Sequence, residues 1–295
     1  MIGRFAPSPS GRMHLGNIFT ALIAWLSVRS QDGKMLLRIE DLDPDRSKRA
    51  YIEALYEDLH WLGLDWDEEM PLQSKRDEVY RAHFDRLKTY PCYCTRNELH
   101  AANAPHVSDG RTVYAGTCRE RLPQSTKKVP AWRVWVDPCE ISFADGVFGN
   151  VTQELSREWG DFIVRRSDGV YAYQLAVVCD DALGGVTEVV RGCDLLSSTP
   201  AQIWLYRQFG YIPPKFYHVP LLVAPDGRRL SKREKDLDLA YLKEHFTPQE
   251  LIGKLAFASH LADSDCPISA SGLVSQFSWQ KLKTEPIVID KQFAV

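Results

Sequence analysis

The sequence contains no long run of apolar residues and no strong excess of charge of one sign. No segment is long and apolar enough to indicate a membrane span, and the first residues show neither a basic leader nor the cleavage site of a secretory signal. The formal net charge of −3 excludes the overall field of a strong non-specific nucleic-acid binder. We therefore predict a cytoplasmic protein without a membrane partner, in which any RNA contact uses a local basic patch.

Familiar phosphate-binding loops are also missing, because neither a Walker sequence nor a GxGxxG sequence occurs. Phosphate binding would therefore use another device. The seven cysteines cannot all pair within the chain, and a reducing cytosol keeps thiols free or metal-bound, so we expect no disulfides. What is present, 44% apolar and 25% charged residues over 295 positions, is typical of a soluble globular protein with a sizeable core.

The first ninety residues alternate between short apolar runs and helical spacing. Residues 2–5 and 34–39 are expected strands, and the Pro- and Ser-containing segment 6–12 is an expected loop. Apolar residues from Leu15 to Leu26 recur at helical spacing, as do those in 52–62 and 79–87. This alternation predicts βαβ units and a parallel sheet.

After residue 90 the composition of the sequence changes. Residues 90–137 combine cysteines with scattered Pro and Gly, which we interpret as an inserted subdomain. Residues 161–166 and 170–178 flank a Ser-Asp-Gly turn and predict a hairpin. Further expected elements are strands at 188–190 and 217–223 and a helix at 199–209. The resulting division has two halves of a main domain at 1–90 and 161–235, an inserted subdomain at 91–160 and a helical region at 236–295.

The segment FAPSPSGRMHLGN places His14 and Gly16 between the first strand and the first helix. Backbone N–H groups at the helix start and an imidazole can then face one anion, which suits a nucleotide. The alternative is purely structural, with His14 capping the helix and Gly16 allowing close packing. This segment alone leaves both interpretations open.

Two further polar segments each follow an expected strand. RLSKR carries Ser231 and Lys232, and a flexible ammonium group there can follow a moving pyrophosphate, although basic runs are also common on solvated surfaces. LLRIEDLDP ends a strand in clustered carboxylates, including Glu40, at the edge where open α/β sheets bind ligands.

Taken together, these segments resemble a known family. HLGN and RLSKR, about two hundred residues apart, resemble the HIGH and KMSKS motifs of class I aminoacyl-tRNA synthetases. FAPSPSG and RIEDLD resemble segments of the glutamyl and glutaminyl synthetases, and the resemblance runs from Ile2 to about Arg233. It implies a Rossmann-like α/β catalytic domain with an inserted zinc-binding subdomain and a short helical C-terminal region. The implied reaction is activation of glutamate by ATP and Mg²⁺ as an adenylate.

The resemblance also implies roles for particular residues. A glutamate pocket is implied at Arg4, Phe5, Ala6, Pro7, Ser8, Glu40, Tyr173 and Arg191. ATP binding is implied at His14, Gly16, Asn17, Ser231 and Lys232, of which His14, Asn17 and Lys232 would be catalytic. Asn17 departs from the motif, because it stands where the family has its second histidine. Without the family, Arg4 is an ordinary ion-pair residue, Glu40 a partner of Arg38 and Tyr173 a core residue.

A metal site is the third pattern. Cys92, Cys94, Tyr114 and Cys118 offer three thiolates and a phenolate, which can form a closed tetrahedral zinc site. The CxC spacing is tighter than in common zinc fingers and tyrosine is a rare ligand, so spacing alone leaves zinc open. The same pattern resembles the zinc site of the glutamyl-Q tRNA(Asp) synthetases, a family of shortened paralogues of glutamyl-tRNA synthetase.

This second resemblance implies the acceptor. In that family glutamate is transferred to queuosine in the anticodon loop of tRNA(Asp), and the final sixty or so residues leave little room for a large anticodon-binding region. Two alternatives remain: a glutamyl-tRNA synthetase fragment that charges a tRNA 3′ end, and a catalytically idle RNA-binding relative. The expected partners are glutamate, ATP and tRNA(Asp) carrying queuosine, and no obligate protein partner is indicated.

Overall fold

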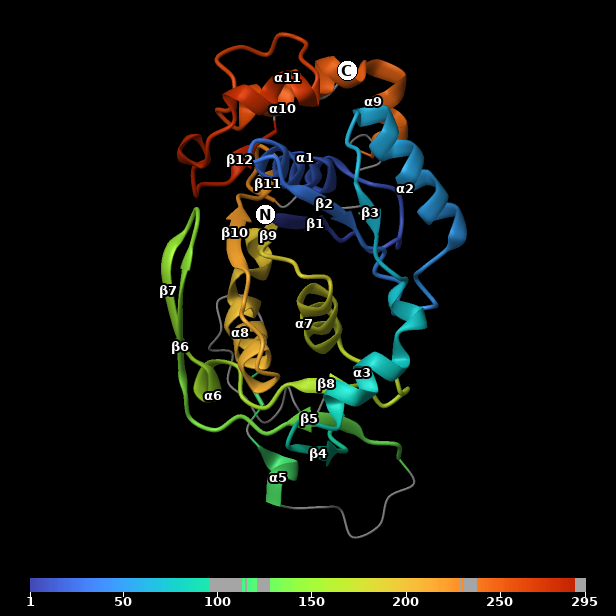
Figure 1. Cartoon of the computed structure of the whole chain (residues 1–295), viewed down its shortest axis with the longest axis vertical. Helices are drawn as coiled ribbons and strands as arrows, with labels where there is room; N and C mark the ends of the chain where they lie inside the picture. The colour runs from blue at the N-terminus through green and yellow to red at the C-terminus, as the bar shows by residue number, and fades with distance from the viewer. Residues whose placement is uncertain (96–112, 115, 121–127, 229, 231–237, 290–295) are drawn as a thin grey trace.

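Parallel strands joined by helices form the centre of the computed structural model, which describes residues 1–95, 113–114, 116–120, 128–228, 230 and 238–289 (Figure 1). The first sheet contains, in order, β1 (Ile2–Phe5), β2 (Lys34–Leu37) and β3 (Glu68–Glu69). All three strands are parallel. The connecting helices are α1 (Leu15–Arg29) and α2 (Arg49–Leu62). The βαβ units predicted for this part of the chain are therefore confirmed.

Helix α1 is buried along most of its length because its sequence is largely apolar on every face. It packs closely on β1 at Gly3, where a Cβ atom would lie 2.4 Å from Cγ2 of Val28. A side chain at position 3 would therefore push α1 away from the strand. This packing holds the N-terminus of α1 near the carboxyl end of β1, the edge at which open parallel sheets bind ligands.

A second group of strands lies beside β1. Its elements are the parallel strands β9 (Glu188–Gly192) and β10 (Lys215–Val219), the 3₁₀ helix η2 (Cys193–Ser198) and helix α8 (Thr199–Gln208). The backbone N–H of Thr187 donates to the carbonyl of Ile2 at 2.9 Å, which places β9 next to β1. An antiparallel hairpin joins the other side of β10 and consists of β6 (Glu140–Asp145) and β7 (Gly149–Glu154).

A three-stranded antiparallel sheet lies at the end of the molecule opposite the C-terminal helices (Figure 1). Its strands are β4 (Thr89–Cys92), β5 (Ala131–Val134) and β8 (Ile163–Arg165). Short helices that precede or connect these strands along the chain are η1 (Gln73–Lys75), α3 (Asp77–Phe84), α5 (Thr117–Glu120) and α6 (Leu155–Glu158). The domain boundaries at residues 90, 160 and 235 stay predictions.

The hairpin expected around residues 167–169 is wrong in its second strand. Only a single bridge from Arg165 to Tyr171 remains of it, and the chain then forms helix α7 (Tyr173–Leu183). The run of aromatic and β-branched residues suggested a strand, but most of α7 is buried, and packing overrides that local preference. The helix places Tyr173 at its first position and two aspartates, Asp180 and Asp181, near its end.

The strand expected at residues 217–223 is divided in two. Strand β10 ends at Val219, and after Pro220 a new strand, β11 (Leu222–Val223), pairs in parallel with β12 (Ile287–Val288). The last part of the described chain is otherwise made of short helices, as predicted, namely α9 (Leu239–His245), α10 (Pro248–Ala258), α11 (Ala270–Leu273), η4 (Val274–Gln276) and η5 (Trp279–Lys281). Among the described residues, no helix has the length and apolar character needed to cross a membrane.

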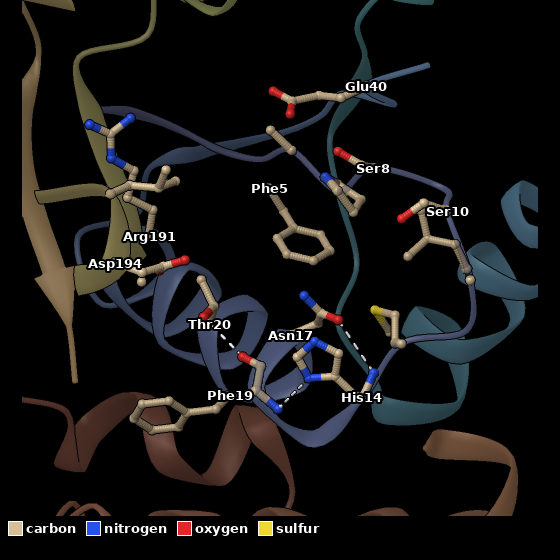
Figure 2. Close-up of a pocket in the computed structure, with 18 of the residues that line it drawn as sticks. Phe5, Ser8, Ser10, His14, Asn17, Phe19, Thr20, Glu40, Arg191 and Asp194 are labelled. Atoms are coloured by element: carbon tan, nitrogen blue, oxygen red, sulfur yellow. Dashed lines mark hydrogen bonds between the residues drawn. The ribbon is translucent and has the colours of Figure 1, made fainter. Parts of the chain in front are cut away.

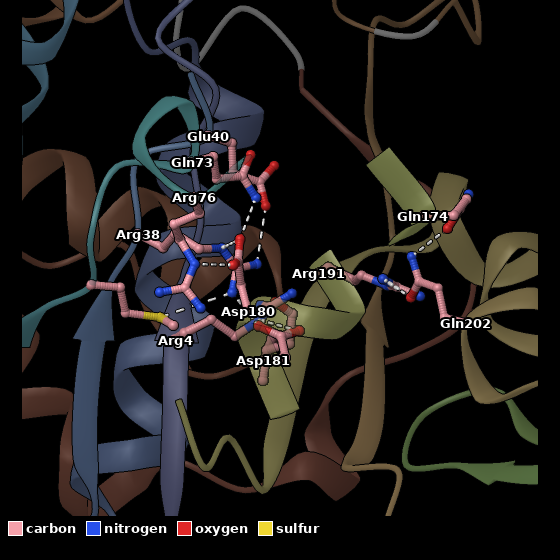
Figure 3. Close-up of polar contacts among 12 residues, drawn as sticks. Arg4, Arg38, Glu40, Gln73, Arg76, Gln174, Asp180, Asp181, Arg191 and Gln202 are labelled. Atoms are coloured by element: carbon pink, nitrogen blue, oxygen red, sulfur yellow. Dashed lines mark hydrogen bonds and ion pairs between the residues drawn. The ribbon is translucent and has the colours of Figure 1, made fainter. Parts of the chain in front are cut away.

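A buried charge network joins the first sheet to α7 (Figure 3). Arg38, directly after β2, is completely buried and donates hydrogen bonds to Asp181 and, at 3.0 Å, to Oε1 of Glu40. Asp181 also lies 3.4 Å from Nε of Arg4 in β1. Burial alone would raise the pKa of Asp181, but the charges of Arg38 and Arg4 lower it below its usual value. The carboxylate is therefore ionised at neutral pH and shared between two buried guanidinium groups.

The neighbouring Asp180 extends this network toward α3. It accepts hydrogen bonds from Nε2 of Gln73 at 2.7 Å and from the hydroxyl of Tyr80 at 2.9 Å, and Nε of Arg76 lies 2.7 Å from it. Burial nevertheless raises the pKa of Asp180. The two adjacent aspartates thus attach α7 to β1 and β2 on one side and to η1 and α3 on the other.

The change Asp181→Asn tests this network, because it leaves Arg38 and Arg4 buried without their shared anion. We expect the free energy of unfolding, measured in urea at neutral pH, to fall by about 3–5 kcal/mol. The matched control is Glu53→Gln, which breaks the solvent-exposed pair with Arg49 and should cost less than about 0.5 kcal/mol. Equal, small effects of both changes would contradict the assignment.

Candidate functional site

One cavity of about 440 Å³ opens at the carboxyl ends of β1 and β9, beside the N-terminus of α1 (Figure 2). It brings together all the predicted glutamate- and ATP-binding residues that the structure describes: Arg4, Phe5, Ala6, Pro7, Ser8, His14, Gly16, Asn17, Glu40, Tyr173 and Arg191. The other two, Ser231 and Lys232, lie outside the described residues. Leu230, which precedes them, lines the same cavity.

His14 and Asn17 cap helix α1 at the edge of the cavity. Nδ1 of His14 accepts a hydrogen bond from the backbone N–H of Gly16 at 3.1 Å, and Oδ1 of Asn17 accepts from the N–H of His14 at 3.3 Å. These reciprocal bonds form a capping box. The capping role considered for His14 is therefore confirmed, and the amide at position 17 takes part in the same cap.

Gly16 allows the imidazole to lie against the first turn of α1. A Cβ atom at this position would lie 3.1 Å from Cε1 and 3.2 Å from Nδ1 of His14. A side chain at position 16 would therefore require the imidazole to shift by a few tenths of an ångström. The positive end of the helix dipole, the imidazole of His14 and the amide of Asn17 thus face one end of the cavity, an arrangement suited to an anion.

Arg191 projects from β9 on the opposite side of the cavity from His14 (Figure 2). Its side chain is almost completely buried and donates to Nε2 of His218 at 3.0 Å, Oε1 of Gln202 at 2.7 Å and Oγ1 of Thr199 at 2.8 Å. None of these acceptors carries a negative charge. Burial lowers the pKa of Arg191, but a guanidinium group stays protonated at neutral pH.

Arg4 and Glu40 lie near one another and are both held by the buried charge network. Arg4 donates to the carbonyl of Val190 at 3.1 Å and lies near Asp181, so the ordinary ion-pair interpretation is part of its role. Glu40 pairs with Arg38, as considered from the sequence, yet it also lines the cavity. Burial raises the pKa of Glu40, while Arg38 and Arg4 act in the opposite direction.

Tyr173 and Ser8 complete this end of the cavity. Tyr173 is the first residue of α7, and burial, followed by the charge of Glu40, raises the pKa of its phenol. It is therefore a neutral hydroxyl that can donate to a ligand. Ser8 is exposed in the loop after β1, and Figure 2 shows its hydroxyl on the same side as Glu40.

Several residues that line the cavity were not predicted. Thr20 lies one turn after Gly16 on α1 and donates to the carbonyl of Gly16 at 3.0 Å, so helical spacing from the HLGN segment could have found it. Asp194 lies three residues after Arg191 and also faces the cavity. Tyr51 and Leu221 come from segments without a motif, and no signal in the sequence pointed to them.

A separate cluster of sulfur and phenol groups lies beside β4. The Sγ atoms of Cys92, Cys94 and Cys118 all lie within 4.8 Å of one another, and Sγ of Cys94 is 3.6 Å from Sγ of Cys118. The hydroxyl of Tyr114 is 3.7 Å from Sγ of Cys92 and 4.0 Å from Sγ of Cys94. The structure therefore brings all four predicted metal ligands together.

These separations can be compared with the geometry of a metal site. Ligands about 2.3 Å from the centre of a tetrahedron lie about 3.8 Å from each other. The separations given above, 3.6, 3.7 and 4.0 Å, lie on both sides of this value. Arg133 lowers the pKa of the Cys92 thiol against the effect of burial, which favours a thiolate there.

Comparison with known proteins gives a consistent family. The family model of the class I tRNA synthetases (E and Q), catalytic domain, matches residues 1–292. A glutamyl-Q tRNA(Asp) synthetase of Symbiobacterium thermophilum is 45% identical, and the match covers 98% of this chain and 96% of the relative. One from Nitratidesulfovibrio vulgaris is 44% identical, with 97% of this chain and 94% of the relative covered.

Solved structures agree with the sequence matches. The crystal structure of a glutamate-tRNA synthetase from Elizabethkingia anophelis superposes with a TM-score of 0.84 at 26% identity, covering 100% of this chain and 69% of that one. The α/β fold with parallel sheets is thus that of a synthetase catalytic domain. The chain belongs to the class I tRNA synthetases (E and Q), and it is a ligase related to the glutamyl-Q tRNA(Asp) synthetases.

Proposed function

We propose that this enzyme activates glutamate with ATP as glutamyl adenylate and transfers the glutamyl group to queuosine in the anticodon loop of tRNA(Asp). The observation that carries the proposal is one cavity with cationic groups and a carboxylate at one end and a capped helix N-terminus at the other. Glutamate has two carboxylates and one ammonium group, and this distribution of charge complements them. The names of the relatives supply the acceptor.

The amino acid would lie between Arg191, Arg4 and Glu40. A planar guanidinium group binds a carboxylate through two parallel hydrogen bonds, so Arg191 and Arg4 suit the side-chain carboxylate. Glu40 would receive the α-ammonium group, and Ser8 and Tyr173 would donate hydrogen bonds to the ligand. Phe5, Ala6 and Pro7 form the wall of the pocket between them.

ATP would bind at the N-terminus of α1. In the first step an oxygen of the glutamate α-carboxylate attacks the α-phosphorus of ATP, the bond to the bridging oxygen breaks, and pyrophosphate leaves. His14, Gly16 and Asn17 position the phosphates, and we assign Ser231 and Lys232 to the leaving pyrophosphate. Mg²⁺ is normally carried by the phosphates themselves rather than by a dedicated protein cage, so the ion would offset their charge.

Glutamate-dependent ATP–pyrophosphate exchange should occur without any tRNA. Arg4, Glu40 and Arg191 are already held by contacts within the chain, so RNA is not needed to assemble this pocket. The measurement is incorporation of labelled pyrophosphate into ATP with purified enzyme, with glutamine as the control amino acid. An exchange signal that requires added tRNA would defeat the prediction.

The second step would form an ester on the acceptor. A cis-diol hydroxyl of queuosine attacks the carbonyl carbon of the adenylate, AMP leaves and the hydroxyl proton is released. The diol resembles that of a terminal ribose, so the same cavity can serve either acceptor. Bases splayed from RNA loops are a common target of protein recognition, which makes an anticodon-loop nucleotide accessible to this site.

Labelled glutamate should be transferred to tRNA(Asp) only when queuosine is present. Two RNA substrates give the clearest comparison. We expect tRNA(Asp) that contains queuosine but lacks its 3′-terminal adenosine to accept glutamate fully. We expect intact tRNA(Asp) without queuosine to accept none. The reverse result would assign ordinary charging of a 3′ end. Absence of transfer to either RNA in an enzyme active in exchange would reject queuosine as acceptor.

We also assign one Zn²⁺ ion to Cys92, Cys94, Tyr114 and Cys118. The separations of the four ligand atoms fit a tetrahedral site, and a closed site of this kind stabilises structure rather than reacting. Zinc would join the segment that contains Tyr114 and Cys118 to β4. The cluster lies at the end of the molecule remote from α1, so this role is separate from the adenylate chemistry (Figure 1).

Metal analysis of freshly purified enzyme should give one zinc per chain. Cys118→Ser should remove most of the metal and lower the melting temperature, because it takes one thiolate from the set. Cys139→Ser is the matched control, since this thiol lies outside the cluster and its loss should leave the zinc content unchanged. Substoichiometric zinc in the unaltered enzyme would contradict the assignment.

A further inference from the structure

The guanidinium group of Arg191 is held by neutral acceptors on three sides. His218 comes from β10, while Thr199 and Gln202 come from α8. Gln202 is itself fixed, because its Nε2 donates to Oε1 of Gln174 at 2.7 Å (Figure 3). Since each contact uses a single donor, one N–H on each terminal nitrogen of Arg191 stays available for a ligand carboxylate. No carboxylate among the described residues forms an ion pair with this buried cation.

The contact with His218 fixes the position of the imidazole proton. A guanidinium group can only donate, so Nε2 of His218 must accept from Nε of Arg191 and cannot carry a proton. The proton therefore lies on Nδ1, which donates to Oδ2 of Asp145 at 2.6 Å. Both side chains of this pair are completely inaccessible to solvent. Asp145 thus selects the one neutral form of His218 that can bind Arg191.

The carboxylate of Asp145 is held by backbone N–H groups of the β-turn that follows it. Its Oδ1 accepts from the backbone N–H groups of Val147 at 3.0 Å and Phe148 at 2.9 Å, in the connection between β6 and β7. The N–H of His218 donates to the same oxygen at 3.3 Å. Because Oδ1 is fully used by backbone donors, only Oδ2 can face the imidazole.

The remaining surroundings of His218 keep it neutral. Phe216 stacks on its ring at an interplanar angle of 14°, and Oγ1 of Thr199 lies 3.2 Å from Nε2. Burial, and then the positive charge of Arg191, lower the pKa of His218, although Asp145 and the more remote Asp194 act in the opposite direction.

We infer that Asp145 and His218 are positioning residues for amino-acid recognition: they hold Arg191 through uncharged contacts, so that its positive charge is reserved for the side-chain carboxylate of the substrate. This inference rests on the proposed glutamate activation and adds two residues that support Arg191 from outside the cavity lining. A carboxylate in place of His218 would neutralise Arg191 internally and weaken its attraction for a ligand. The neutral imidazole orients the guanidinium group without that cost.

The change Asp145→Asn separates orientation from packing. The carbonyl oxygen of the new amide must occupy the place of Oδ1 to satisfy the backbone donors, so its NH₂ group would face Nδ1 of His218. The imidazole proton would then move to Nε2 and point at the N–H of Arg191. Two donors would oppose each other, and Arg191 would lose its alignment while the volume of the side chain stays the same.

In ATP–pyrophosphate exchange, we expect Asp145→Asn to raise the KM for glutamate about tenfold or more. The KM for ATP should change little, because Asp145 and His218 do not touch the nucleotide end of the cavity. Two-bond ¹H–¹⁵N correlation of ¹⁵N-histidine-labelled protein should report the Nδ1–H form of His218 in the unaltered enzyme and the Nε2–H form in the variant.

Asp161→Asn is the matched control. Asp161 is another buried aspartate, which accepts from the hydroxyl of Tyr90 at 2.5 Å and from the backbone N–H of Val136 at 2.8 Å, away from Arg191. It should lose thermal stability but keep the KM for glutamate. This control distinguishes a specific loss of glutamate recognition from the general cost of altering a buried carboxylate.

Three outcomes would overturn the inference. The first is an unchanged KM for glutamate in a folded Asp145→Asn enzyme. The second is an equal rise in the KM for glutamate in Asp161→Asn, and the third is an Nε2–H form of His218 in the unaltered enzyme. Absence of any glutamate-dependent exchange in the unaltered enzyme is a different result, because it would reject the proposed function itself.

Discussion

The fold of the site depends on one buried cation, Arg38, and the anions that surround it. Taking a guanidinium group out of water is costly unless anions and hydrogen bonds replace the solvent. Asp181 and Glu40 provide this compensation, and they come from α7 and from the segment after β2. Because Asp181 also contacts Arg4, the same carboxylate sets the distance between the first sheet and α7. Arg4 and Glu40 line the cavity, and their positions therefore depend on how these buried charges compensate one another.

Structural and chemical roles coincide in this cavity rather than excluding each other. His14 caps α1 and at the same time presents its ring at the helix N-terminus, and Glu40 pairs with Arg38 while lining the pocket. A residue that is fixed by a structural contact is already oriented before a ligand arrives, which reduces the entropy lost on binding. The amide of Asn17 illustrates the point, because its Oδ1 accepts from the backbone N–H of His14 and so supports the same cap.

The sequence predicted the strands and loop around HLGN well because strand, glycine-containing turn and helix are all specified by neighbouring residues. It failed at α7, where a β-branched segment adopts a helix because contacts with α3 and α8 outweigh local preference. Arg4 and Arg191 were found only through family resemblance, whereas Glu40 was also indicated by its place among carboxylates at the end of an expected strand. Asp145 and His218 could not be found at all, because their meeting across 73 residues of sequence depends on the placement of the hairpin β6–β7 beside β10.

The position of β10 between β6 and β9 also bears on how the protein is made. A nascent chain emerges from the ribosome with its N-terminus first. Two strands that are distant in sequence can pair only after both have emerged. Arg191 leaves the ribosome before Thr199, Gln202 and His218, so the acceptors that support its guanidinium group are still inside the ribosome when it emerges. We expect the amino-acid pocket to be among the last parts to acquire native order, and premature termination before β10 to yield a chain that cannot hold its substrate.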